Sequence, residues 1–462
     1  MWDKLRTIRI RLLETLWFVP ALIALGGVAL AVGMVEVSAW ANPEVLARFP
    51  RVFGASADSA RTLLSAIGSS IITVAGVTFS LTMVAVAQAS SQYTSRILRT
   101  FMRDRPTQVV LGTFIAIFAY CLVVLRTVRS VDESPFVPSI AVVASIVLAM
   151  IGMAALLYFI HHIAASLQVS HLLARIGAET LSAIDRLFPD GVADEVSPRD
   201  HETTLQDLQG ATWHAVNARS TGYLQRIELD RLSKIASRCG LVVKGEVSVG
   251  EFVVEDTPMA LTTPANPPSH NENGAASPNG DGDPDALVAS CFGVGTFRTI
   301  DQDAAFGIRQ IVDVALKALS PGVNDTTTAV TCIDWIGAVL VRLANRSVGS
   351  PLRLTKGEVR IIAHRPTFAE LVALCIDEIR QSADGNVATL TAMLTMLERV
   401  HRVTRHPGRR RVLEHHARLL AAHAQRHITS GHDRIRLRRL ATTITSRRRS
   451  ADDDPVLAPV FE

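Results

Sequence analysis

The sequence predicts a membrane protein with four transmembrane α-helices, followed by a cytoplasmic α+β domain with a helical C-terminal part. Two observations lead to this prediction. Long apolar runs are concentrated in the first third of the 462 residues, whereas the charged residues are concentrated in the remainder. Basic and charge-balanced loops alternate between these runs, which an even number of spans explains, with both termini on the cytoplasmic side.

Composition along the chain divides it into six predicted segments. These are a four-helix transmembrane domain (1–160), a membrane-proximal helix with a small α+β unit (161–256), a disordered insertion (257–285), a strand-helix-turn-helix region (286–350), a helical region (351–450) and an acidic tail (451–462).

The first apolar run, Leu16–Val35, is predicted to be a retained span. It follows several basic residues, as a signal peptide would, but it is too long and lacks a small-residue cleavage site at its end. The other three spans are predicted at Leu63–Ala87, Val109–Leu125 and Ser139–Ile160.

The second span has an unusual polar face. It contains no ionisable residue and is long enough to cross a hydrocarbon core about 30 Å thick. Small and weakly polar residues recur along it at steps of three, four and seven: Ser69, Thr73, Gly76, Ser80, Ala87 and Ser91. Such a face favours a partner helix or water over lipid. One interpretation is that the stripe lies near the axis of a homo-oligomer, where it lines a pore or packs against other subunits. The other is that it allows close helix packing within one subunit.

The loop after the second span is strongly basic. Arg96, Arg99 and Arg103 lie in it, with Asp104 as the single acid. Because Lys and Arg near short spans resist translocation, this loop and the basic N-terminus are predicted to be cytoplasmic. In a pore, these arginines would form an inner mouth that favours anions.

The cytoplasmic part is predicted to begin with a helix that continues the fourth span to Leu187. A small α+β unit follows, with two strands in Trp213–Ile227, a helix at Leu229–Arg238 and a strand pair in Leu241–Val254. The segment Thr257–Asp285 has almost no large apolar residue. It is predicted to be a disordered insertion, because it cannot bury enough surface to offset its ordering entropy.

The rest of the chain is predicted to be mainly helical. After a strand at Leu287–Val294, helices are predicted at Gln302–Leu319, Thr326–Leu343, Phe368–Val403 and Val412–Ile444. Asn324 or Asp325 can cap the second of these helices by accepting hydrogen bonds from the amides of its first turn. Thr367 and Glu370 have the spacing of a capping box at the third.

A polar cluster in this region is the candidate anion-binding site. Arg298, Arg309, Asn324, Asp325 and Thr327 combine two guanidinium groups with a helix start whose free amides can bind a phosphate-like group. The alternative is that Arg309 belongs to a solvated ladder along its own helix, while Asn324 or Asp325 merely caps the next one. No Walker-type or dinucleotide-type glycine spacing accompanies the cluster.

Metal and catalytic patterns are sparse. His416, His423 and His427 could share a helix face as metal ligands do, but arginines crowd this helix and no acid joins the face, so a solvated helix face is preferred and no metal is assigned. The five cysteines are scattered without CxxC spacing. Neither catalytic residues nor a cofactor are predicted, and enzyme activity is the least supported function class.

The segment 402–449 is rich in arginine and has few acids. Near a membrane, such a surface can attract anionic lipid headgroups, although a solvated helical face is the commonest explanation. Nucleic acid is not expected as a partner, because no aromatic residues are interleaved with the arginines.

One segment, FRTIDQDAAFGIRQIVDVALKALSPGVNDTTTAV, closely resembles the signature of a bacterial family of predicted membrane proteins, domain of unknown function 2254. The segments TVAGVTFSLTMVAVAQASSQYTSRIL and GYLQRIELDRL also resemble that family. Members commonly have a proline after the Asn-Asp pair, whereas Thr326 stands there in this chain. The resemblance covers most of the chain; it implies a multi-pass protein of the bacterial cytoplasmic (inner) membrane, and it implies no reaction.

These features lead to two main function hypotheses. The first is an oligomeric channel or transport-like protein, with the second span near the axis and the cytosolic domain as a gate. The alternative is a membrane-anchored ligand sensor, or a structural membrane protein without a conduit. In the sensor, a small anionic ligand would bind near Arg298 and the Asn324–Thr328 turn.

Overall fold

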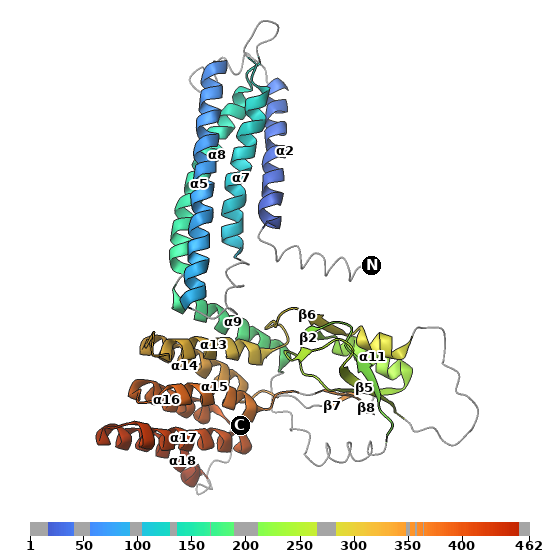
Figure 1. Ribbon diagram of the computed structural model, residues 1–462, viewed down its shortest axis with the longest axis vertical. Helices are drawn as coiled ribbons and strands as arrows, with labels where there is room; N and C mark the ends of the chain where they lie inside the picture. The colour runs from blue at the N-terminus through green and yellow to red at the C-terminus, as the bar shows by residue number, and fades with distance from the viewer. Residues whose placement is uncertain are drawn as a thin grey trace, which may run out of the picture. The chain divides into compact units, whose positions relative to one another are not determined.

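The computed structural model describes residues 17–40, 56–92, 104–129, 136–166, 168–188, 211–265, 283–347, 352–355, 358–363 and 365–451. The chain separates into two compact units, residues 1–172 and 173–462. The first contains long helices, and the second contains two β-sheets and a stack of helices (Figure 1).

The long helices of the first unit are α2 (Phe18–Trp40), α5 (Ala57–Gln92), α7 (Arg105–Thr127) and α8 (Ser139–Ser166). Each is long and apolar enough to cross a membrane, and so is α14 (Thr326–Leu343) in the second unit. The prediction of several membrane-length helices is confirmed. All four helices of the first unit extend beyond the predicted apolar runs, α5 and α7 at both ends and α2 and α8 at the carboxyl end, because polar residues there continue the helix.

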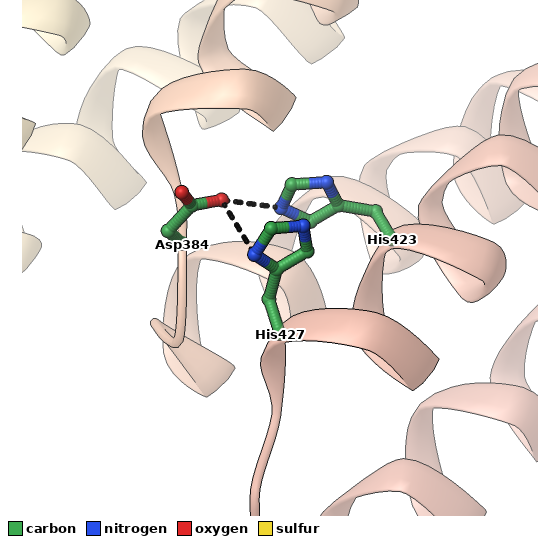
Figure 2. Close-up of side chains that lie close together, drawn as sticks. All are labelled: Asp384, His423 and His427. Atoms are coloured by element: carbon green, nitrogen blue, oxygen red, sulfur yellow. Dashed lines mark ion pairs between the residues drawn. The ribbon is translucent and has the colours of Figure 1, made fainter.

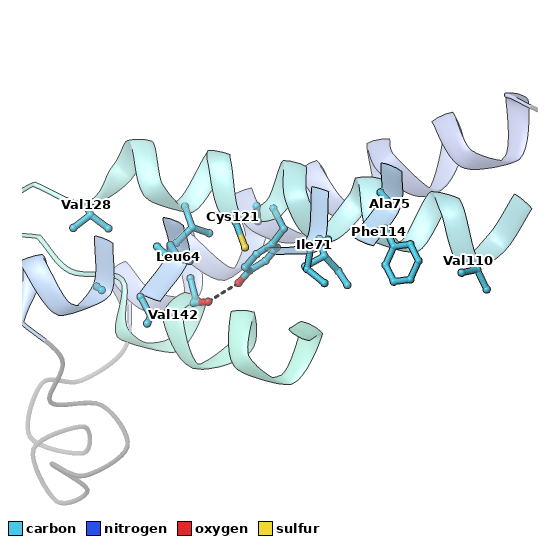
Figure 3. Close-up of a cluster of buried hydrophobic side chains, with 14 of the residues drawn as sticks. Leu64, Ile71, Ala75, Val110, Phe114, Cys121, Val128 and Val142 are labelled. Carbon is cyan, nitrogen blue, oxygen red and sulfur yellow. Dashed lines mark hydrogen bonds between the residues drawn. The ribbon is translucent and has the colours of Figure 1, made fainter. Parts of the chain in front are cut away.

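Helix α7 lies at the centre of the first unit. It contacts α2, α5 and α8, and Phe114 on it is fully buried among apolar side chains such as Ile71 and Ala75 (Figure 3). The buried Tyr120 hydroxyl donates a hydrogen bond of 2.8 Å to the main-chain oxygen of Ala141 on α8. Within one chain, α7 rather than the second span α5 therefore organises the packing.

The outer surface of the first unit is apolar. Large apolar side chains are exposed on all four helices, among them Leu22, Leu25, Phe79, Val84, Leu122, Met150 and Leu157. Contiguous exposed apolar surface of this extent is rare on soluble monomers. It is the surface that lipid contact requires.

The second unit contains two small sheets. The five-stranded sheet has the order β1 (His214–Asn217), β5 (Pro258–Pro264), β3 (Leu241–Gly245), β8 (Glu358–Ile362) and β7 (Leu352–Thr355), and the three-stranded sheet has the order β4 (Phe252–Val253), β2 (Gly222–Ile227) and β6 (Phe292–Gly295). Strands β3 and β8 pair in parallel, and the other pairs are antiparallel. Helix α11 (Leu229–Cys239) contacts β3 and β8 and buries Leu232.

Three predictions for the α+β unit, the insertion and the strand that follows it are wrong. Strands that follow one another do not pair, since β1 and β2, and likewise β3 and β4, belong to different sheets. The predicted disordered insertion begins too early, because β5 lies inside it and pairs with both β1 and β3; residues 266–282 of that segment lie outside the described residues. A strand is predicted from Leu287, but that residue lies in helix α12 (Pro284–Ala289), which Asp283 caps, and strand β6 begins only at Phe292.

The predicted helical region 351–450 is wrong at its start, where β7 and β8 lie. The other helical predictions are correct in type, although several are too long. Helix α13 (Ala304–Leu319) and α14 agree with the prediction. The helix predicted to continue from the fourth span is separate, since α8 ends at Ser166 and α9 (Val169–Leu187) follows. Each of the last two predicted helices is divided into two separate helices. The first is divided into α15 (Phe368–Ser382) and α16 (Val387–Val403), and the second into α17 (Pro407–His427) and α18 (Gly431–Ala451).

The helices from α13 to α18 form a stack (Figure 1). Helix α15 contacts both α13 and α17, while α16 contacts both α14 and α18. Helices two apart in the sequence are therefore neighbours. This arrangement brings the end of α15 close to the end of α17, where Asp384, His423 and His427 lie together.

Candidate functional site

The small-residue stripe of the second span faces away from its own bundle. Ser69, Thr73, Gly76, Ser80 and Ala87 are all exposed on α5, and nothing lies within 4 Å of a Cβ built on Gly76. Ser91 belongs to α5 as well, but its side chain lies outside the described residues.

The opposite side of α5 is the one that packs inside the chain. Leu64, Ile71, Thr78 and Thr82 are buried there. At about 100° of rotation per residue, these positions lie roughly 180° from the stripe. Packing within one subunit, the second interpretation of the stripe, therefore uses other residues of α5.

Two hydroxyl groups of the stripe, those of Ser69 and Thr73, are bonded to their own helix. Thr73 donates a hydrogen bond of 2.8 Å to the main-chain oxygen of Ser69, and Ser69 donates one of 3.2 Å to that of Ala66. Such bonds let Ser and Thr occupy an apolar environment without an unsatisfied donor. The stripe can thus contact either a partner helix or water.

The predicted inner mouth, Arg96, Arg99 and Arg103, lies outside the described residues. Its neighbour Asp104 is described and caps α7 by accepting a 3.3 Å hydrogen bond from the Thr107 amide, and it also accepts one of 2.6 Å from the Thr107 hydroxyl. The same carboxylate lies 2.7 Å from Nε2 of His162 on α8, whose ring stacks on Tyr158. The pair ties one end of α7 to α8.

Both arginines of the candidate anion site are paired with carboxylates. Arg298 donates to Asp303 at 2.7 and 3.0 Å. Arg309 donates to Asp313 at 2.8 Å on its own helix and, through both terminal nitrogens, to Glu378 on α15. The hydrogen bond with Glu378, followed by Asp313, raises the pKa of Arg309.

The turn of the candidate anion site lies at the other end of α13 from these arginines. Arg298 precedes α13 and Arg309 is in its first half, whereas Asn324, Asp325 and Thr327 follow its last residue. A helix of 16 residues is about 24 Å long. The structure therefore does not bring the two halves of the predicted site together.

Asp325 is the residue that caps α14. Its carboxylate accepts a 3.0 Å hydrogen bond from the Thr328 amide and a 2.6 Å one from the Thr328 hydroxyl. These bonds lower the pKa of Asp325, with the hydroxyl contributing most. A carboxylate thus already occupies the amide-rich start of α14, whereas Asn324 and Thr327 are exposed beside it.

Within the described residues, a group of side chains that could hold a metal ion lies elsewhere, where α15 and α17 end. Asp384, His423 and His427 point toward one another, and one ligand atom from each lies within 4.8 Å of the others (Figure 2). Oδ1 of Asp384 is 3.0 Å from Nε2 of His423 and 3.3 Å from Nδ1 of His427. Burial, followed by the neighbouring His427, lowers the pKa of His423.

Sequence reasoning found the two histidines of this group and missed the acid. Asp384 lies in the turn between α15 and α16, where Gly385 has a φ of +71°, and the sequence predicted one uninterrupted helix there. The Asp-Gly pair is a turn signal that was present in the sequence. The third histidine considered in the sequence, His416, lies 3.6 Å from a different acid, Asp377.

Comparisons with known proteins agree with a membrane protein. Residues 14–399 match the family described as predicted membrane protein (DUF2254). The chain is 32% identical over 390 residues to the uncharacterized protein Mb1321c of Mycobacterium bovis and to the uncharacterized protein Rv1290c of Mycobacterium tuberculosis, over 83% of this chain and 71% of each relative. No solved structure matches the chain significantly.

Proposed function

Because the chain belongs to the DUF2254 family of predicted membrane proteins, we propose that it is an oligomeric channel or transport-like protein of the bacterial inner membrane. In this proposal α2, α5, α7 and α8 are the spans, α5 lies near the shared axis, and both termini are cytoplasmic. The second unit is the cytosolic part that gates the conduit. Lipids contact the apolar outer surface of the bundle.

The observation that carries the proposal is the direction of the stripe. A face of small and hydroxylated residues, exposed and roughly opposite to the packed side of α5, is suited to a second helix at close range or to water. Its flanks, Phe79 and Leu81, are large and exposed. The stripe is therefore a narrow band within an otherwise lipid-suited surface.

Helix α14 is assigned to the cytosolic part although its length and composition would allow a span. It contacts α13 and α16, and Ile336, Val339 and Leu340 on it are buried. Asp334 on its exposed side forms an ion pair with Arg399 at 3.5 Å. Packing on two sides and an exposed ion pair are typical of a helix in a water-soluble stack.

Cysteine cross-linking in membranes tests the oligomer. Single cysteines at Thr73 and Ser80 should cross-link between subunits at least about ten times faster than cysteines at Phe79 and Leu81, which lie about 100° away on the same helix. Of the five natural cysteines only Cys239 is not buried, so the Cys239→Ser variant serves as the background. Equal cross-linking on the stripe and its flanks would refute the oligomer around α5.

A bulky residue at Gly76 gives an independent test. Gly76→Leu should leave the single chain folded, because nothing lies within 4 Å of the new Cβ, and should dissociate the oligomer. Gly33→Leu on α2, where the Cβ is equally free, is the matched control and should leave the oligomer intact. Gel filtration with light scattering distinguishes the two variants.

Labelling separates a conduit from a closed oligomer. In a conduit, a water-soluble thiol reagent should modify cysteines at Ser69, Thr73, Gly76 and Ser80. Complete protection of all four, together with efficient cross-linking, would exclude the channel and retain the oligomer. That result would favour the alternative function, a membrane-anchored sensor or structural protein without a conduit.

A further inference from the structure

The turn between α15 and α16 carries an acid that faces two histidines of α17. Asp384 and His427 are partly exposed, whereas the His423 side chain is 5% exposed. The buried Nε2 of His423 makes no hydrogen bond within the described residues, although Oδ1 of Asp384 is 3.0 Å away. The two atoms are close and are not aligned as donor and acceptor.

From this geometry we propose that Asp384, His423 and His427 form a binding site for a first-row divalent transition-metal ion of the Zn²⁺ class. Imidazole nitrogen and carboxylate oxygen are ligands of such ions, at about 2.0–2.2 Å from the metal. Ligand atoms at the corners of a tetrahedron of that size are roughly 3.3–3.6 Å apart. The separations of 3.0 and 3.3 Å between Asp384 and the two histidines need only a small adjustment.

The local structure holds two of the ligands in place. His423 and His427 are four residues apart on α17, so both side chains project from the same face, and their rings stack at 4.2 Å between centroids. His423 uses Nε2 and His427 uses Nδ1 to face Asp384 (Figure 2). Because Asp384 and His427 are partly exposed, the fourth position of the ion would be open to water.

The electrostatics of the site have two opposing contributions. Arg380 and Arg426 lie close enough to His423 to disfavour positive charge there. Against them, Asp384 supplies a negative charge, and both α15 and α17 end at this place, at Ser382 and His427. Helix C-termini carry partial negative charge that favours a cation. Two such ends beside a carboxylate offset the two guanidinium groups.

A bound ion would connect the α15–α16 turn to the end of α17.

A second acid and histidine pair lies nearby, between the same two helices. Its members, Asp377 and His416, are seven residues before Asp384 and His423. In that pair the side chain of His416 is buried, and a single histidine faces the acid. The site is therefore confined to the end of the helices, where a second histidine and solvent access are both present.

Metal binding to the full-length protein in detergent tests the inference, after EDTA treatment, with Zn²⁺ for affinity and Co²⁺ as the spectroscopic probe. The natural protein should bind one Zn²⁺ and give Co²⁺ visible bands without thiolate charge transfer. Asp384→Asn and His427→Gln, both at partly exposed positions, should weaken Zn²⁺ binding at least about tenfold. Zn²⁺ should also raise the thermal midpoint of the natural protein and leave that of Asp384→Asn unchanged.

The controls are His415→Gln on the exposed side of α17 and His432→Gln, whose side chain is 87% exposed. Both should retain Zn²⁺ affinity within about twofold, since neither group faces Asp384. Natural affinity in Asp384→Asn and His427→Gln would overturn the proposal. So would thiolate bands in the Co²⁺ spectrum, or an absence of binding to the natural protein. The outcome is independent of the channel proposal, which concerns α5.

Discussion

The guanidinium group of Arg409 donates a 2.7 Å hydrogen bond to the main-chain oxygen of Arg346, just beyond the carboxyl end of α14. The same nitrogen donates to the main-chain oxygens of Leu343 and Ala344 at 3.2 and 3.1 Å. Arg409 is 2% exposed, and its guanidinium carbon lies 5.1 Å from the centre of the Phe368 ring. A side chain from α17 therefore caps α14, whose last carbonyl groups have no partner within the helix.

Replacing Arg409 should destabilise the second unit. Arg409→Met keeps the apolar stem and removes the donors, so the carbonyl groups at the end of α14 lose a charged hydrogen-bond partner. Hydrogen bonds to charged groups contribute about 1.5–3 kcal/mol, and the free energy of unfolding should fall by about that amount. Arg411→Met, at an exposed position of the same helix, is the control. Urea unfolding in detergent, followed by tryptophan fluorescence, measures both; equal stabilities would contradict the capping role.

The contact between α2 and α7 should depend on Gly27 and tolerate change at Gly26. A Cβ on Gly27 would lie 2.7 Å from the main-chain oxygen of Ala116, whereas nothing lies within 4 Å of a Cβ on Gly26. Backbone cannot move aside as a flexible side chain does, so Gly27→Ala should cost about 1–3 kcal/mol of bundle stability. Gly26→Ala should be neutral or slightly stabilising, because alanine favours the helix. Folded protein remaining after heating, measured by gel filtration, compares the pair.

The stability of the helical stack should fall in weak acid through His416. Burial lowers the pKa of His416, and His415 and Arg380 act in the same direction, while Asp377 opposes them. As pH falls below about 6.5, the ordinary histidine pKa, the unfolded chain takes up a proton before the folded chain does. The stability provided by neutral His416 is therefore present above this pH and is lost progressively below it.

His416→Gln should reduce that loss. With EDTA present, the difference between thermal midpoints at pH 7.5 and pH 5.5 should be smaller for His416→Gln than for the natural chain. His432→Gln, altered at a side chain that is 87% exposed, should behave like the natural chain. An equal pH dependence in all three proteins would show that His416 does not contribute.

Membrane orientation can be checked with reporter fusions. Four basic residues precede the first span and the arginine-rich loop follows the second, whereas the two opposite loops pair their cations with acids. A fusion after Ser130 should report the periplasm and a fusion after Arg175 the cytosol. The opposite pattern, or one compartment for both fusions, would overturn the arrangement of four spans with cytoplasmic termini.

The sequence by itself determined the membrane-length helices of the first unit and the local helix starts. Runs such as Leu63–Ala87 predict a helix long and apolar enough to cross a membrane, because length and composition decide whether a segment can leave water. Helix caps at Asp325 and at Thr367 with Glu370 were predictable as well, since their partners lie within three or four residues. These features depend on short-range chemistry, and the sequence displays that chemistry directly.

Tertiary structure alone decided which distant residues meet. The stripe of α5 was visible in the sequence, but its direction depended on α7 occupying the opposite side of the helix. The carboxylates that pair with Arg309 include Glu378, 69 positions away. Asp384 reaches His423 because a turn ends α15 beside the end of α17. Long-range packing sets these contacts, and no spacing along the chain encodes the neighbour that a helix face will have.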